Sequence, residues 1–398
     1  MKPTRTEPTM RHTSFRSRKA LGAACAALLT CLAPGAFVGG PARADTPVNF
    51  EGPAVPATAD LNHDGMPDVV FSNFALGNGI SVFLGQPGGG FRPAVHYHTG
   101  GQADYVAIAD LNHDGVPDLA VTNFTPSTVS ILIGRGDGTF EPAVDYPTGP
   151  APGAVVATDL NHDGNLDLTT SNQSPLLSVL LGHGDGTFGA TRTVSTELGT
   201  GSGSLDAADF DGDGNVDLLR GNYVNSTIQV YRGLGNGGFQ RPMTLTQGGL
   251  TAWYGLARDV NGDHRPDIVF SNLVANTVSI RFNQGGMRFS APQVYPTGGV
   301  LPQCFDFGDV NGDGIADLVV ADAGTSSFSV LLGTGGGRFG PPHVHSTGGA
   351  FPLSTPLLGD FNADHKLDVV IGNTATGNVV LRYGDGAGGF GPALDYPA

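Results

Sequence analysis

The sequence predicts an all-β fold, a single seven-bladed β-propeller built from four-stranded antiparallel blades. The first observation is a nine-residue acidic pattern, D-x-[DN]-x-D-x-x-x-D, which occurs seven times with its copies starting 49 to 51 residues apart. The second is the content of each interval, where short β-branched and apolar segments alternate with glycine-rich turns. Four strands in a repeat of about 50 residues are typical of propeller blades. Seven such repeats fill residues 49–398.

The composition agrees with this fold class. Glycine accounts for 62 of the 398 residues, while only 14% of the residues are charged. The glycines follow no G-x-y period, which excludes a collagen-like chain. A chain of this length ordinarily folds as two or three domains, but the repeats leave no room for a second one.

The second repeat illustrates the expected blade. We expect its strands at residues 105–109, 118–122, 128–133 and 140–146, with the acidic loop between the first two. An F-x-x-P segment opens the fourth strand, and a further copy of this segment begins at Phe50. One terminal copy therefore completes the last blade while the other lies beside it, and the sequence leaves open which does so.

The N-terminal region has the features of a secretory signal peptide. Several basic residues precede an apolar stretch at 20–38, and the small-residue site Ala42-Arg43-Ala44 follows that stretch. We expect cleavage after Ala44, a signal peptide at 1–44 and a secreted domain at 45–398. A membrane anchor is the alternative, but Pro34 and the cleavage site argue against it. No later segment is long enough to span a bilayer.

Cysteine usage suggests that a metal stabilises the fold. The chain has three cysteines, and only Cys304 lies beyond residue 44. The secreted domain therefore has no internal disulfide. We expect Cys304 to be a buried apolar group, and bound metal to supply the missing crosslink.

The seven acidic loops predict up to seven calcium sites. Positions 1, 3, 5 and 9 of each loop carry Asp or Asn, whose hard oxygens calcium prefers, and a main-chain carbonyl at position 7 is expected to add a ligand. The loops lack the Glu of an EF-hand at position 12, and strands flank them. The predicted side-chain ligands are Asp60, Asn62, Asp64, Asp68, Asp110, Asn112, Asp114, Asp118, Asp159, Asn161, Asp163, Asp167, Asp209, Asp211, Asp213, Asp217, Asp259, Asn261, Asp263, Asp267, Asp309, Asn311, Asp313, Asp317, Asp360, Asn362, Asp364 and Asp368. The predicted carbonyl ligands belong to Met66, Val116, Asn165, Asn215, Arg265, Ile315 and Lys366.

Position 6 of the loop distinguishes two of the sites. Five loops carry glycine there, which adopts a positive φ without strain, whereas His264 and His365 replace it in loops 5 and 7. A side chain in that conformation costs on the order of 1 kcal/mol. We therefore expect weaker calcium binding at loops 5 and 7.

Charge supports the metal interpretation. Beyond residue 44 the chain has 13 Lys and Arg residues against 35 Asp and Glu residues, a net charge of −22 that seven Ca²⁺ would bring to −8. Metal-free Asx turns are the alternative, but three or four carboxylates in one turn repel each other unless a cation neutralises them. An acidic chain of this kind is not expected to bind nucleic acid or to insert into membranes.

The acidic loops, F-x-x-P strands and glycine-rich hairpins together resemble the FG-GAP/VCBS repeat family, which includes the propeller of integrin α-subunits. The resemblance covers the whole secreted domain. It implies structural calcium in loops between the first and second strands, with ligands bound on the opposite face or between blades. All seven blades carry a loop here, whereas integrin propellers carry only some, so the resemblance does not extend to an integrin-like partner surface. Some fungal lectins are also similar.

The predicted function is that of a monomeric recognition or adhesion module for an extracellular protein or glycan. A lectin is the alternative, and an extracellular polysaccharide lyase or hydrolase a further one. Trp253, Tyr254 and Tyr105 are the candidate ligand-binding residues, because aromatic rings near a propeller mouth can stack on sugars. Neither G-x-S-x-G nor HExxH occurs, so we expect no catalysis.

An amide also recurs at the end of the second strand of each repeat. Two interpretations stay open, because these side chains either satisfy local hydrogen bonds or form a polar ring for a ligand. The residues are Asn73, Asn123, Asn172, Asn222, Asn272 and Asn373, with Asp322 in the sixth repeat.

Overall fold

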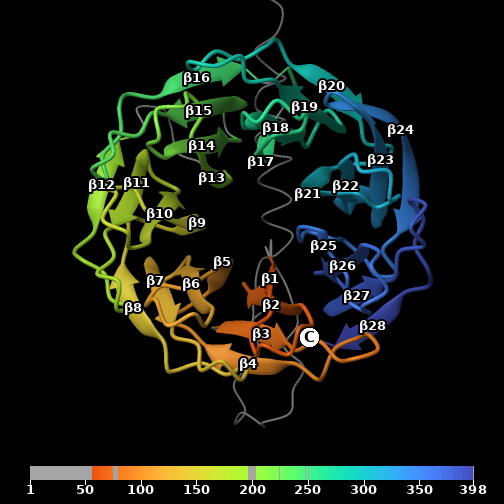
Figure 1. The fold of residues 1–398 in the computed structure, drawn as a ribbon, viewed down its shortest axis with the longest axis horizontal. Coiled ribbons are helices and arrows are strands. Elements are labelled where there is room, and N and C mark those ends of the chain that lie inside the picture. The colour runs from red at the N-terminus through yellow and green to blue at the C-terminus, as the bar shows by residue number, and fades with distance from the viewer. Residues whose placement is uncertain are drawn as a thin grey trace, which may run out of the picture. The chain divides into compact units, whose positions relative to one another are not determined.

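The chain forms seven four-stranded antiparallel sheets, which are arranged radially as the blades of a propeller (Figure 1). The computed structural model describes residues 56–74, 79–195, 203–223, 225–246, 248–249 and 251–397. The blades are β1–β4 (Ala57–Ala59, Asp68–Asn73, Gly79–Phe83, Val95–His98), β5–β8 (Ala103–Ala109, Asp118–Asn123, Thr128–Leu132, Val144–Pro147), β9–β12 (Pro152–Thr158, Asp167–Asn172, Leu176–Leu180, Arg192–Ser195), β13–β16 (Leu205–Ala208, Asp217–Asn222, Thr227–Tyr231, Met243–Thr246), β17–β20 (Ala252–Arg258, Asp267–Asn272, Thr277–Arg281, Gln293–Pro296), β21–β24 (Pro302–Gly308, Asp317–Asp322, Ser327–Gly335, Arg338–Ser346) and β25–β28 (Leu357–Gly359, Asp368–Asn373, Asn378–Arg382, Leu394–Pro397).

Strand order within each blade follows the chain, with the first strand at the axis and the fourth at the rim (Figure 1). The predicted all-β, seven-bladed architecture is therefore confirmed. Among the described residues, a single 3-10 turn at Ala323–Thr325 is the only helical element, and no helix is long and apolar enough to cross a membrane. The predicted signal peptide and its cleavage site lie outside the described residues.

The second strand of each blade forms the core. Every residue of β2, β6, β10, β14, β18, β22 and β26 is buried, because a neighbouring blade covers each face of the sheet. Most of these strands accordingly carry consecutive rather than alternating apolar residues, whereas β10 and β14 also bury polar side chains such as Thr169 and Arg220.

The fourth strand of the second blade begins later than the sequence predicts. In the second blade Phe140 forms only an isolated bridge with Gly134, and β8 begins at Val144 instead of residue 140. Pro142 lies between them and has no N–H to offer a strand ladder.

The F-x-x-P phenylalanines pack between blades. At several boundaries the phenylalanine meets, edge to face, an aromatic side chain from the fourth strand of the preceding blade. The Tyr146–Phe188 ring centroids are 5.6 Å apart, and the Tyr97–Phe140 centroids are 5.4 Å apart. The recurring motif is thus an inter-blade contact.

The ring closes without strand exchange between the termini. Blade 1 takes all four strands from the N-terminal side and blade 7 all four from the C-terminal side, with β28 as the outer strand. The Phe50 copy lies outside the described residues. Closure is made by side chains: the Phe91 ring lies 5.6 Å from that of Phe361 and 5.3 Å from that of Tyr396.

Candidate functional site

Each acidic loop joins the first strand of its blade to the second, as predicted. The Asp at position 9 opens the second strand, and its carboxylate is completely buried in all seven blades. In loop 1, the N–H of Leu61 donates to Asp68 Oδ2 at 2.8 Å, and the N–H of Gly85 donates to Asp68 Oδ1 at 2.7 Å. The same two bonds recur in the other six loops. This carboxylate therefore clamps the loop to the hairpin between the third and fourth strands, a role the sequence did not predict.

Burial raises the pKa of the position-9 carboxyl. Its two backbone hydrogen bonds lower this pKa, and the nearby loop carboxylates raise it. The pKa reaches about 6 for Asp68, Asp217, Asp267 and Asp368. These groups therefore carry a desolvation cost that a bound cation would offset.

The carboxylates at positions 1 and 5 organise the turn itself. In loop 1, Asp60 accepts the N–H of Asp64 at 3.1 Å and that of Gly65 at 2.9 Å, while Asp64 accepts the N–H of Met66 at 2.9 Å. A carboxylate has about four acceptor sites, so each retains capacity for a metal. The loop is thus preformed around its oxygen donors.

Two positions of each loop adopt a positive φ. Position 6 does so as predicted, including His264 at 64° and His365 at 66°. Position 4 also lies in the left-handed region, and loops 1 to 3 carry a histidine there. The sequence analysis did not predict this second positive φ. His113 Nε2 lies 3.1 Å from Asn165 Oδ1 of the next loop, and His162 Nε2 lies 2.8 Å from Asn215 Oδ1. These contacts link neighbouring loops.

Three loop carboxylates gather in loop 4, the one loop with an aspartate at position 3. There Asp209, Asp211 and Asp217 each offer a ligand atom, and these atoms all lie within 4.8 Å of one another. The donors are all oxygens, the class that calcium prefers over softer ligands. The loop residues therefore suit a hard divalent cation.

Protein cations already contact some loop carboxylates. Arg232 Nε lies 2.5 Å from Asp211 Oδ2, and its Nη2 lies 2.9 Å from Asp213 Oδ2. In loop 5, Arg265 Nη2 lies 2.6 Å from Asp263 Oδ2. The two arginines already neutralise part of the loop charge and repel an incoming metal ion. Loops 4 and 5 therefore gain the least electrostatic stabilisation from a bound metal.

The recurring asparagines at the end of the second strand are structural. All seven side chains are buried. Asn123 Nδ2 donates to Ser130 Oγ at 2.7 Å, and Asn73 Nδ2 donates to Ser81 Oγ at 3.0 Å. Local hydrogen bonds therefore account for the amide N–H groups of Asn73 and Asn123, whereas both side-chain polar atoms of Asn373 lack a partner among the described residues. The burial of all seven side chains argues against a solvent-facing ligand ring.

Asp322 is the one carboxylate in this buried set, and burial raises its pKa to about 7. Because the folded state holds the proton more tightly than the unfolded one, stability falls as the pH rises from about 4 to 7. We expect Asp322→Asn to stabilise the protein by roughly 2–4 kcal/mol at pH 8, with no gain at pH 4, measured by chemical denaturation. The converse change Asn123→Asp should destabilise at pH 8. Equal effects of Asp322→Asn at pH 4 and pH 8 would contradict the raised pKa of Asp322.

The aromatic ligand candidates separate in the structure. Trp253 lies against Tyr223, with ring centroids 5.6 Å apart. Tyr105 of blade 2 and Tyr254 of blade 5 instead influence each other's pKa. Burial raises the pKa of Tyr105, and Asp206 and Cys304 raise it further, whereas a hydrogen bond with Tyr254 and the charge of Arg258 lower it.

The groups that act on the pKa of Tyr105 belong to blades 4, 5 and 6, while its ring packs at the boundaries between blades 2 and 3 and between blades 3 and 4. Cys304 is buried, as predicted, and burial raises its pKa to about 12, which makes it a poor nucleophile.

Three charged residues near these tyrosines were missed by the sequence analysis. Asp206 Oδ2 accepts the N–H of Ala257 at 2.8 Å and lies 3.3 Å from Arg258 Nη1. Asp306 likewise accepts the N–H of Leu358 from the next blade at 3.3 Å. The inner strands that carry Asp206, Arg258 and Asp306 contain no recognisable motif. Only the folded structure shows that these residues lie near one another.

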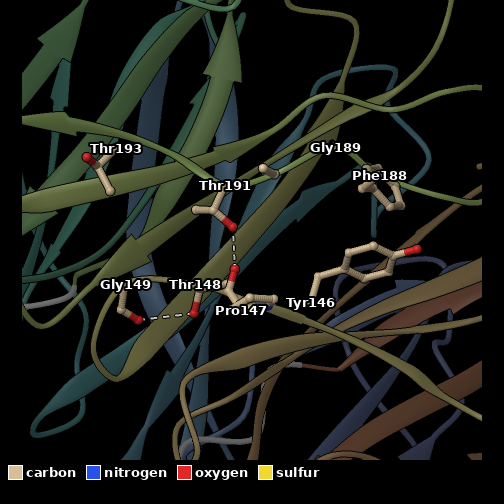
Figure 2. Close-up of a pocket in the computed structure, with 9 residues that line it drawn as sticks. Tyr146, Pro147, Thr148, Gly149, Phe188, Gly189, Thr191 and Thr193 are labelled. Atoms are coloured by element: carbon tan, nitrogen blue, oxygen red, sulfur yellow. Dashed lines mark hydrogen bonds between the residues drawn. The ribbon is translucent and has the colours of Figure 1, made fainter.

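Shallow grooves lie at the rim between neighbouring blades. One, of about 480 Å³, lies between blades 2 and 3 (Figure 2). Tyr146 and Phe188 lie together at one end and Thr193 lies at the other, while the Thr191 hydroxyl donates to the Pro147 carbonyl. A second groove of about 460 Å³ occupies the equivalent place between blades 1 and 2.

Comparison with known proteins identifies the repeat. The model of the FG-GAP-like repeat matches residues 60–121, 110–170, 168–220, 210–270, 259–320 and 309–371. Among curated protein sequences none matches.

Solved structures share the fold at low identity. The periplasmic gluconolactonase PpgL of Pseudomonas aeruginosa has a TM-score of 0.61 and 14% identity, covering 81% of this chain and 93% of its own. A putative 6-phosphogluconolactonase of Bacteroides fragilis has a TM-score of 0.59 and 14% identity, covering 87% and 96%. BBS1N in complex with ARL6DN has a TM-score of 0.59 and 10% identity, covering 88% and 94%.

These neighbours correct the prediction that the chain is not an enzyme. Two of them are named as lactonases, so the same architecture carries hydrolases and the absence of a linear motif excludes nothing. The physical reason is that catalytic groups are defined by geometry, and a propeller can assemble them from several blades without any contiguous signature.

Proposed function

Because the chain belongs to the FG-GAP-like repeat family, we propose that it is a calcium-stabilised propeller that acts in recognition outside the cell. The observation that carries this proposal is the preformed loop, repeated seven times, in which oxygen donors gather around one turn and one carboxylate is wholly desolvated. Up to seven Ca²⁺ would neutralise the loops. This chain's own contribution is to hold the donors in place through backbone hydrogen bonds before the ion arrives.

The proposed ligand is an extracellular glycan, with an extracellular protein as the alternative. The axial tyrosines and the rim grooves both offer hydroxyl groups beside aromatic rings, which suits sugars. We further propose that the mature chain begins near residue 45 and is a secreted monomer. A glycan array probed with residues 45–398, in calcium and in EDTA, tests the recognition role.

Calcium titration tests the metal sites. We expect about seven ions per chain, with the weaker sites in loops 4, 5 and 7. Replacing Arg232 by Gln removes a cation from Asp211 and Asp213, so we expect one site to tighten about two- to fivefold in isothermal calorimetry. The matched control is Arg135→Gln, because Arg135 is exposed and pairs with Glu141 rather than with a loop. Unchanged affinity in Arg232→Gln would remove Asp211 and Asp213 from the ligand set.

A further inference from the structure

The inner strands depart from the repeat at a few positions, and these departures carry chemistry. The third residue before each loop is apolar in five blades and an aspartate in blades 4 and 6. In chain order these residues are Ala57, Ala107, Val156, Asp206, Leu256, Asp306 and Leu357. The residue just before the loop is small in six blades, and in blade 5 it is Arg258. In a repeat protein, a local departure from the pattern is expected where one copy has a particular function.

The fold itself does not need these charges. Asp206 and Asp306 each accept an N–H from the inner strand of the next blade, which on its own would suggest an inter-blade contact. However, the other five blades pack at the same position with Ala, Val or Leu. The carboxylates are therefore additions to a boundary that closes without them, and they carry a desolvation cost.

The departures converge at the axis. Arg258 Nη1 lies 3.3 Å from Asp206 Oδ2 across the boundary of blades 4 and 5. The charges of both residues act on Tyr105 of blade 2, Tyr105 and Tyr254 influence each other, and Arg258 also acts on Asp306. Four blades thus contribute to one cluster, which we call the axial cluster: Tyr105, Asp206, Tyr254, Arg258 and Asp306. Solvent still reaches it, because the side chains of Asp206 and Arg258 are 17% and 49% exposed.

An unsatisfied polar group lies at the same level of the ring. Ser204 occupies, in blade 4, the position that Tyr105 and Tyr254 occupy in theirs, five residues before the loop. Its side chain is 6% exposed, and its hydroxyl has no hydrogen-bond partner among the described residues. A buried hydroxyl without a partner calls for a water or a ligand group.

We propose that the axial cluster binds a neutral polyhydroxyl ligand, a single sugar residue either free or at the end of a glycan. Carboxylates accept hydrogen bonds, a guanidinium donates them and phenols do both, so together they match the hydroxyls of a sugar ring. A cation would meet Arg258, and an anion would meet two carboxylates in an acidic protein. The inference rests on the proposed recognition function and gives it a location.

Saturation-transfer NMR of residues 45–398 in calcium tests the proposal, with D-glucose, D-galactose, D-mannose and L-fucose as probes. We expect transfer to at least one sugar, and at least tenfold weaker binding in Asp306→Asn and in Tyr254→Phe. Asparagine can still accept the N–H of Leu358, so Asp306→Asn should remain folded, and its melting temperature checks this. Asp322→Asn, a buried carboxylate away from the axis, is the matched control and should bind within twofold of the unmodified chain.

Three results would overturn the proposal. The first is no transfer to any sugar from the folded protein. The second is unchanged affinity in both axial variants. The third is loss of binding in Tyr146→Phe alone, which would place the sugar in the rim groove. Calcium titration of the same samples keeps these results separate from the metal assignment, because the sites would load with calcium even if no sugar binds.

Discussion

We expect chelation with EDTA to lower the melting temperature of residues 45–398 by roughly 15 °C or more. A ligand present at about 100 times its Kd stabilises the folded state by about 2.7 kcal/mol per site, and seven sites add their contributions. The unfolded chain loses these sites, since the donors converge only through the hydrogen bonds of the folded loop. Differential scanning calorimetry in 2 mM calcium and in EDTA measures the shift.

The control for chelation is magnesium. Mg²⁺ is smaller and demands stricter octahedral geometry, so it should restore little of the lost stability whereas calcium should restore all of it. A melting temperature unchanged by EDTA would mean that the loops are self-sufficient turns. Their internal hydrogen bonds make this alternative physically sound, so the experiment separates two real possibilities.

The fold and the loop residues were predictable because short repeated sequence patterns specify both. Seven copies of a nine-residue pattern specify seven turns, and the spacing between copies fixes the blade content. The clamp made by Asp68 and its equivalents was not predictable, because its partner Gly85 lies 17 residues away in a hairpin whose position depends on the sheet. Sequence analysis assigned this carboxylate to metal alone.

The axial cluster was only half predicted for the same reason. Tyr105 and Tyr254 stand out as aromatic residues, but nothing in the sequence brings Asp206 or Arg258 to them from other blades. Trp253, the most conspicuous candidate, lies instead against Tyr223. The error of excluding catalysis arose in the same way, since a search for contiguous motifs cannot detect a site assembled across a ring.

Ring closure gives the second large effect. Phe91 is buried where blade 1 meets blade 7, against Phe83, Phe361 and Tyr396. We expect Phe91→Ala to cost about 3–5 kcal/mol, the range for removing a buried aromatic ring. For a chain of this size that cost lowers the melting temperature by roughly 4–7 °C, measured by calorimetry in calcium.

The matched control is Phe188→Ala, which removes the equivalent ring between blades 2 and 3, beside Tyr146. Those blades remain joined by the short connection from β8 to β9, so a weakened contact re-forms at little entropic cost. Blades 1 and 7 have no such connection, because no strand passes between them. Phe91→Ala should therefore also open the ring, seen as faster proteolysis of the terminal blades, while Phe188→Ala should not. Equal proteolysis of the two variants would show that closure relies on contacts other than this aromatic cluster.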